Sequence, residues 1–143
     1  MASKVFLDAN ILLDLTLKRK GYNEAKEIFN LAVNSYIKIY ITSSIVTITG
    51  HWLTKAYGAS KAKEILLTLL IDVSVIDTPH EIVLMALHSK INDIEDSLQY
   101  YTAIENKLDY FISRDIKLKK ESIPALPVVS PLELLKEFNT TNL

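Results

Sequence analysis

The stretch KVFLDAN, residues 4–10, decides how this chain folds. Its three consecutive apolar residues, 5–7, predict a strand that is covered on both faces, as in a parallel sheet. Asp8 follows this run directly, where a carboxylate is costly to desolvate unless the fold gives it a partner. Asn10 can cap a short helix from Ile11 to about Leu17. Asp8 is therefore the first candidate for a functional residue.

Beyond this stretch, short β-type runs alternate with helical periodicity, and glycine or proline marks many of the boundaries. That order predicts βαβ units and an α/β fold. Further strands are expected at residues 38–41, 73–76, 108–112 and 126–129. Helices are expected at 22–36, from the caps at 42–44 to 57, at 60–70, from Thr78-Pro79 to about 90, from Asn92 onward, and from Ser130 to about 138.

The chain has 143 residues, of which 49% are hydrophobic, so it is long enough for one compact domain. We expect this domain to span residues 1–138, followed by a frayed tail at 139–143. No apolar run approaches the roughly 18 residues that a membrane-spanning helix needs. The sequence thus predicts a soluble, cytoplasmic protein without a membrane partner.

Charge and cysteine content exclude several kinds of function. The formal net charge is −1, so any affinity for nucleic acid must come from local basic clusters, at residues 18–20 and at Lys117, Lys119 and Lys120. Cysteine is absent, which excludes a disulfide framework, a thiolate zinc site and a cysteine nucleophile. The three histidines are too scattered for a metal triad. Any metal bound here is expected to have oxygen ligands.

Two further acids are expected to meet Asp8. Asp115 follows the predicted strand at 108–112, and ligands of parallel sheets bind beyond the carboxyl ends of the strands. Asp96 lies in the first turns of the helix that opens at Asn92. Unless a divalent cation held them, three carboxylates brought to one cleft would raise one another's pKa.

A helical wheel orients the helix that carries Asp96. It places Ile94, Leu98 and Tyr101 in the core, and Asp96 and Asp93 on the flank beside them, and it directs Glu95, Gln99 and Thr102 away from both. Structural explanations also exist for some of these polar residues. Acids in a first turn complement the helix dipole, aspartate often begins a turn after a strand, and Asn10 can be a cap and no more.

Three segments resemble the PIN domain family: FLDANILLD at residues 6–14, DIEDSLQYY at 93–101 and ISRD at 112–115. They are similar, in this order and at these separations, to the opening strand and helix, the central acidic helix and the closing acidic turn of that family. The resemblance covers most of residues 3–138. It implies a three-layer α/β/α domain with a central mostly parallel sheet of four to five strands.

The resemblance also implies a function and partners. PIN domains carry a ribonuclease site that depends on Mg²⁺ or Mn²⁺, and many free-standing members are VapC-like toxins of bacterial toxin–antitoxin pairs. An RNA substrate and an antitoxin protein are therefore expected partners. A homodimer is expected by analogy with small nuclease domains of this kind.

Position by position, the resemblance assigns the metal-binding acids to Asp8, Asp96 and Asp115, with Asn10 and Ser113 as supporting polar residues. One departure matters. The family commonly has a glutamate where this chain has Thr49, so Thr49 is expected to contact a metal-bound water instead. Asp93 is expected to restore the missing negative charge as a further metal ligand.

The expected reaction is hydrolysis of an RNA phosphodiester by a metal-activated water. Arg114 is expected to contact the scissile phosphate, because its planar fork suits that group. Lys117, Lys119 and Lys120 are expected to hold flanking phosphates with little sequence preference.

Two other functions stay open on the sequence. One is a catalytically silent module of the same fold that has lost an acid at Thr49 and now binds RNA or a protein. The other is a phosphatase or phosphotransferase with Asp8 as nucleophile. Asn10 argues against the latter, since an acid–base partner would be wanted two residues after the nucleophile.

Overall fold

The computed structural model of this chain describes residues 2–141, and the side chains of residues 2–138. A five-stranded sheet forms its centre, with the strand order β3-β2-β1-β4-β5. Every neighbouring pair of strands is parallel, which confirms the predicted α/β fold. The strands are β1 (Ser3–Leu7), β2 (Ile37–Thr42), β3 (Val73–Ile76), β4 (Tyr110–Ile112) and β5 (Val128–Val129).

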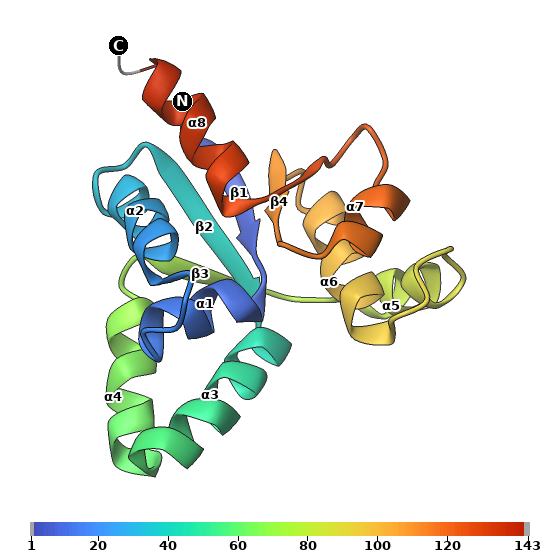
Figure 1. Cartoon of the computed structure of the whole chain (residues 1–143). Coiled ribbons are helices and arrows are strands. Elements are labelled where there is room, and N and C mark those ends of the chain that lie inside the picture. The colour runs from blue at the N-terminus through green and yellow to red at the C-terminus, as the bar shows by residue number, and fades with distance from the viewer. Residues whose placement is uncertain (1, 142–143) are drawn as a thin grey trace.

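The helices form the two outer layers of an α/β/α sandwich. From β1 through β2 to β3 the chain moves one way across the sheet, and from β3 through β4 to β5 it moves the other way. Because crossovers between parallel strands are right-handed, the two series of helices lie on opposite faces. Figure 1 shows α1–α4 and α5–α7 on opposite sides of the strands. The helices are α1 (Ala9–Thr16), α2 (Tyr22–Val33), α3 (Ser43–Tyr57), α4 (Ala59–Leu69), α5 (His80–Leu87), α6 (Ile94–Glu105), α7 (Ile116–Glu121) and α8 (Pro131–Thr141).

The core is densest around β1, the central strand. Residues 5–7 are completely buried, as their unbroken apolar run predicts. The Phe6 ring stacks on Phe111 of β4 at 4.9 Å between ring centroids. Tyr100 of α6 lies against Phe111 and donates its hydroxyl proton to the carbonyl of Leu126 at 2.6 Å. These contacts fix α6 over the β1–β4 pair, at whose carboxyl ends the candidate acids lie.

Local sequence signals explain several helix boundaries. The Thr42 side chain caps α3 by accepting from the amide of Ile45. Gly58 has φ +87°, a conformation that favours glycine, and it separates α3 from α4. Ser130 and Glu133 form a reciprocal capping box at the start of α8, with bonds of 3.1 and 3.0 Å. These predicted boundaries are confirmed.

Several predicted helix starts are wrong by one or two residues. Asp8, not Asn10, occupies the N-cap position of α1. The hydroxyl of Thr78 bonds to Thr102 at 2.6 Å instead of capping α5, which begins at His80. Asp93, not Asn92, caps α6. In the first and third cases an aspartate competes for the cap with a nearby asparagine, and local sequence does not separate two such good caps.

Other boundaries differ in length. Helix α2 ends at Val33, three residues before the predicted end, because Ser35 has a positive φ of 64°. Helix α7 was not predicted, since a helix of one to two turns shows no clear periodicity. Helix α8 continues to Thr141, past the predicted end near Phe138. Residues 142–143 lie outside the described residues, so the frayed tail stays a prediction.

Candidate functional site: carboxylates at the edge of the sheet

Asp8 and Ser113 follow the carboxyl ends of two neighbouring strands. The register of β1 and β4 pairs Leu7 with Ile112, and the amide of Asp8 donates to the carbonyl of Ile112 at 3.2 Å. The Ser113 hydroxyl donates to Oδ2 of Asp8 at 3.0 Å, and its oxygen accepts from the amide of Asp115 at 3.1 Å. Ser113 therefore joins the first and last of the three predicted acids. The crevice beyond such strand ends is where α/β sheets bind ligands.

The environment of Asp8 disfavours its charged form. Burial raises the pKa of the Asp8 carboxyl, and the negative charge of Asp115 raises it further. The Ser113 hydroxyl and the amides of Ala9 and Asn10 partly offset that rise by bonding to the ionised form. A cation bound nearby would therefore stabilise the charged form of Asp8.

Asp96 carries the largest perturbation of any described acid. Its pKa rises from 3.8 to about 7 because of burial first, and then because of the negative charges of Asp93, Asp8, Asp115 and Glu95. Asp96 belongs to α6, whereas Asp8 and Asp115 follow β1 and β4. The fold therefore brings the three predicted acids within electrostatic reach of one another. Perturbation of this kind is typical of functional sites, although structural networks produce it too.

Two of the acids also have a structural task. Asp93 caps α6, with its Oδ1 accepting from the amide of Asp96 at 2.9 Å. Asp115 caps α7, with its Oδ1 accepting from the amides of Lys117 and Leu118 at 2.9 and 3.1 Å. The alternative structural explanation for each thus has direct support in the fold. Capping uses Oδ1 of each carboxylate.

A cavity of about 160 Å³ opens beside these acids. Its lining residues come from the start of α6 and from α7, and they are Ile91, Asp93, Asp96, Asp115, Lys117, Leu118 and Glu121. Sequence reasoning missed Glu121, because α7 itself was not expected. One Glu121 carboxylate oxygen is buried without a hydrogen-bond partner among the described residues. The cavity therefore has acidic walls with one cation, Lys117, among them.

The wheel prediction for α6 is wrong about which side faces the core. Ile94 is 63% exposed, whereas Gln99 and Thr102 are buried. The reason is that two inward polar side chains of α6 have partners: Gln99 accepts from the Thr42 hydroxyl, and Thr102 bonds to the part-buried Thr78. Because helix orientation follows these pairs, apolar spacing alone does not predict it.

Glu95 differs from expectation for the same reason. The wheel directs it away from the site, but burial and the charges of Asp8 and Asp93 raise the pKa of the Glu95 carboxyl. Glu95 therefore lies within electrostatic reach of Asp8. Sequence reasoning discounted this residue, and no signal in its spacing would have recovered it.

The side chains of the two predicted supporting residues on helices make no hydrogen bond to the acids among the described residues. Thr49 is completely buried in α3, its hydroxyl has no partner among the described residues, and it does not line the acidic cavity. Asn10 is exposed and contacts Arg19, whose Nη2 donates to the Asn10 carbonyl at 3.2 Å and to its Oδ1 at 3.4 Å. The backbone amide of Asn10, by contrast, bonds to the Asp8 carboxylate.

The predicted phosphate-binding cations have different environments. The Arg114 guanidinium forms an ion pair with Asp14 of α1. Lys119 donates to both carboxylate oxygens of Glu133, at 2.7 and 2.9 Å. Lys117 lines the acidic cavity, and Lys120 is exposed. Only Lys117 is placed directly beside the acids.

The donor atoms of the site suit a hard divalent cation, but their arrangement does not form a ready-made metal site. Across residues 2–141, no three His, Cys, Asp or Glu side chains are arranged so that they could hold a metal ion as they stand. The donor set is nevertheless all oxygen, with four other carboxylates raising the pKa of Asp96. Magnesium retains several of its waters, so a few carboxylates are enough to bind it.

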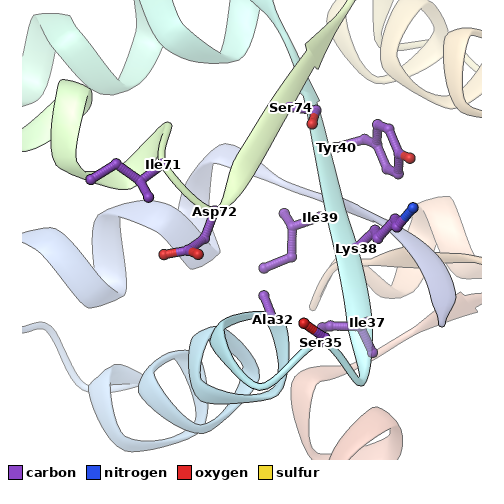
Figure 2. A pocket seen from close by; sticks show the side chains of 9 residues that line it. All are labelled: Ala32, Ser35, Ile37, Lys38, Ile39, Tyr40, Ile71, Asp72 and Ser74. Atoms are coloured by element: carbon purple, nitrogen blue, oxygen red, sulfur yellow. The ribbon is translucent and has the colours of Figure 1, made fainter.

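A second cavity, of about 330 Å³, lies near the amino ends of β2 and β3. Figure 2 shows its lining residues around the first half of β2 and the turn that leads into β3, including Lys38, Tyr40 and Asp72. Asp8 and Asp115 follow the opposite, carboxyl ends of their strands. This second cavity is therefore separate from the acidic site.

Comparison with known proteins assigns the family. The PIN domain profile matches residues 4–117, which is most of the chain. This chain belongs to the PIN domain family. Its sequence has no significant match among curated proteins.

Three solved PIN-like structures share the fold of this PIN domain. VapBC2 from Rickettsia felis, bound to a DNA fragment from its promoter, has a TM-score of 0.67 at 18% identity, covering 89% of this chain and 98% of its own. A toxin–antitoxin complex from Klebsiella pneumoniae has a TM-score of 0.63 at 22% identity, covering 89% and 97%. VapC20 of Mycobacterium tuberculosis, a toxin that cleaves the sarcin–ricin loop, has a TM-score of 0.59 at 13% identity, covering 75% and 86%.

At these identities the three neighbours support the fold, and the family assignment rests on the profile match. None of the helices in residues 2–141 is both long enough and apolar enough to span a membrane.

Proposed function

We propose that this PIN domain is a metal-dependent endoribonuclease that acts in the cytoplasm as the toxin of a toxin–antitoxin pair. The observation that carries the proposal is the convergence of Asp8, Asp96 and Asp115 at the carboxyl edge of the sheet, where the pKa of Asp96 rises to about 7. Family membership adds support, because PIN domains are in general nucleases.

In this proposal Asp8, Asp96 and Asp115 hold Mg²⁺ or Mn²⁺, with Asp93 as a further ligand. A cation in such a site supplies an activated water and neutralises charge on the phosphate. Ser113 orients Asp8 through its 3.0 Å hydrogen bond. Lys117 lies beside the acids and would balance part of the negative charge when an RNA phosphate enters.

The partners belong to the same proposal. Two structural neighbours are toxin–antitoxin complexes, which supports an antitoxin as partner here. A homodimer rests on analogy alone. Co-purification with the product of an adjacent small gene, and loss of toxicity when both genes are expressed, would test the antitoxin assignment.

The deciding experiment combines metal binding with RNA cleavage. Wild type, Asp8→Asn and Asp96→Asn are melted during a Mn²⁺ titration, since a ligand that binds only the folded state must raise stability. The same proteins are assayed on single-stranded RNA. We expect the wild type to gain thermal stability and cleave RNA, and both variants to lose both properties. Asp72→Asn, an exposed acid at the second cavity, is the matched control.

The competing function is a catalytically silent module that binds RNA or protein. Buried Thr49 in place of an acid, and the absence of a ready-made metal-holding triad among residues 2–141, favour it. A flat Mn²⁺ titration of the wild type, together with RNA binding but no cleavage, would establish the silent module and refute the nuclease.

A further inference from the structure

Asp14 is a buried carboxylate that holds two arginines from different parts of the chain. It lies in α1 and is only 4% exposed. Arg19, in the turn before α2, donates its Nε to Asp14 Oδ1 at 3.0 Å. Arg114, in the turn after β4, pairs with the other oxygen, Oδ2. Two guanidinium groups thus share one buried anchor.

Both arginines are linked to residues of the acidic site, one through its neighbours in sequence and the other through Asn10. Arg114 lies between Ser113, which bonds to Asp8, and Asp115, which lines the acidic cavity. Arg19 reaches Asn10, two residues after Asp8, through its Nη2. Neither arginine lines the acidic cavity, so the pair lies outside it, while the chain connects it closely to Asp8 and Asp115.

Gly21, which precedes α2, leaves room for this ion pair. A Cβ atom at Gly21 would collide with a guanidinium nitrogen of Arg114 and with Asp14 Oδ2. The φ of Gly21 is −86°, so its backbone conformation does not require glycine. A larger residue there would have to displace the ends of the Arg114 and Asp14 side chains.

The net positive charge of this cluster and the unused N–H donors of its two arginines suit an anionic ligand. Two guanidinium groups and one carboxylate sum to a local charge of about +1, because arginine stays protonated in proteins. Recorded contacts use Nε and Nη2 of Arg19 and Nη1 of Arg114, which leaves further N–H donors. The Arg19 and Arg114 side chains remain 40% and 44% exposed. One arginine is enough to neutralise Asp14. The second arginine adds a positive charge that faces solvent.

We propose that Arg19 and Arg114 form one phosphate-binding clamp, positioned by Asp14, that takes an RNA backbone phosphate next to the scissile one. This inference rests on the proposed ribonuclease function and adds a substrate subsite to it. Guanidinium groups bind phosphate oxygens through paired, charge-assisted hydrogen bonds. Holding both forks in place beforehand lowers the entropy cost of binding.

The test measures binding of a fluorescent single-stranded RNA oligonucleotide by anisotropy, in EDTA so that cleavage does not interfere. Arg19→Gln and Arg114→Gln should each weaken binding by about tenfold, as expected for loss of a charge-assisted hydrogen bond. Each should also lower the salt slope of log affinity by about 0.7. The double variant should lose less than the product of the two effects, since both groups hold one phosphate. Lys61→Gln, which removes a surface pair with Glu64 on α4, is the control.

The variant Asp14→Asn distinguishes the positioning of the two arginines from the effect of the protein's net charge. Removing a negative charge should strengthen RNA binding if net charge alone matters, whereas the clamp requires binding to weaken. Because loss of a buried carboxylate can unfold the chain, Arg114→Lys is measured alongside: it keeps the charge but loses the fork. The clamp predicts that Arg114→Lys weakens binding with an unchanged salt slope.

Equal or tighter binding by Asp14→Asn, or arginine variants that behave like Lys61→Gln, would overturn the clamp. So would a wild type that fails to bind RNA. Failure of the nuclease proposal looks different: the wild type would bind RNA with the predicted arginine dependence, yet would not cleave it when Mn²⁺ is supplied.

Discussion

The Ser113 hydroxyl lies 3.0 Å from Oδ2 of Asp8 and joins the ends of the neighbouring strands β1 and β4. The same oxygen accepts from the amide of Asp115 at 3.1 Å. One small side chain thus ties two acids that are more than a hundred positions apart in sequence. The strand register places the ends of β1 and β4 side by side, so the contact between Ser113 and Asp8 depends on the sheet.

Ser113→Ala should therefore destabilise the protein and disturb the acids. Ser113 is buried, and loss of its hydroxyl leaves an Asp8 oxygen without its partner, at a cost of about 1–2 kcal/mol. Urea unfolding measures that cost. Ser44→Ala, an exposed serine at the start of α3, should change stability by less than about 0.5 kcal/mol. Equal effects of the two changes would show that the hydroxyl contributes nothing to the site.

Stability of the metal-free protein should fall as pH rises from about 5 to about 8. The pKa of Asp96 is raised from 3.8 to about 7, so the folded state retains a proton that the unfolded state has already lost. The stabilisation is complete below the ordinary pKa and disappears as pH passes the raised value. Burial raises the pKa of Asp8 in the same direction.

Thermal melting in EDTA across this pH range measures the effect. Asp96→Asn should flatten the profile and raise the melting temperature near the upper end of the range. Mn²⁺ should rescue wild type there and leave Asp96→Asn nearly unchanged. A wild-type melting temperature that stays level or increases with pH would contradict the raised pKa of Asp96.

Local sequence predicts the parts of this fold that local forces determine. The apolar run at residues 5–7 forms the central strand, and Gly58 and the Ser130–Glu133 box mark helix ends as expected. The positions of Asp8 and Asp115 after strands β1 and β4 follow from the same reasoning. Each of these features depends on residues that are close together in the chain.

Features set by distant pairs could not be predicted in this way. The orientation of α6 follows the Gln99–Thr42 and Thr102–Thr78 bonds, and no single segment contains both members of either pair. Arg114 was assigned to a phosphate from its chemistry alone, whereas its pairing with Asp14 needs α1 and the β4 end in place. Glu121 belongs to a helix too short for periodicity to reveal.

Thr49→Val should be neutral or should stabilise the protein by up to about 1 kcal/mol. The Thr49 hydroxyl is fully buried without a partner among the described residues, and valine fills the same space without a polar group. Thr102→Val is the contrasting change, because that hydroxyl donates to the carbonyl of Leu98 at 2.6 Å and bonds to Thr78. It should cost about 1–2 kcal/mol in urea unfolding. If Thr49→Val instead reduced the Mn²⁺ response, the hydroxyl would serve the metal site after all.

Lys117 and Lys119 should differ in their importance for RNA, although they lie two positions apart. Lys117 shares a cavity with Asp96 and Asp115, whereas both carboxylate oxygens of Glu133 engage the Lys119 ammonium. Lys117→Gln should lower RNA affinity and reduce the salt slope by about 0.7, as for one phosphate contact to a single strand. Lys119→Gln should leave RNA affinity unchanged and cost less than about 1 kcal/mol of stability, because exposed ion pairs contribute little. Anisotropy titrations at several salt concentrations separate the two, and equal losses of affinity would mean that the Glu133 pair opens when RNA binds.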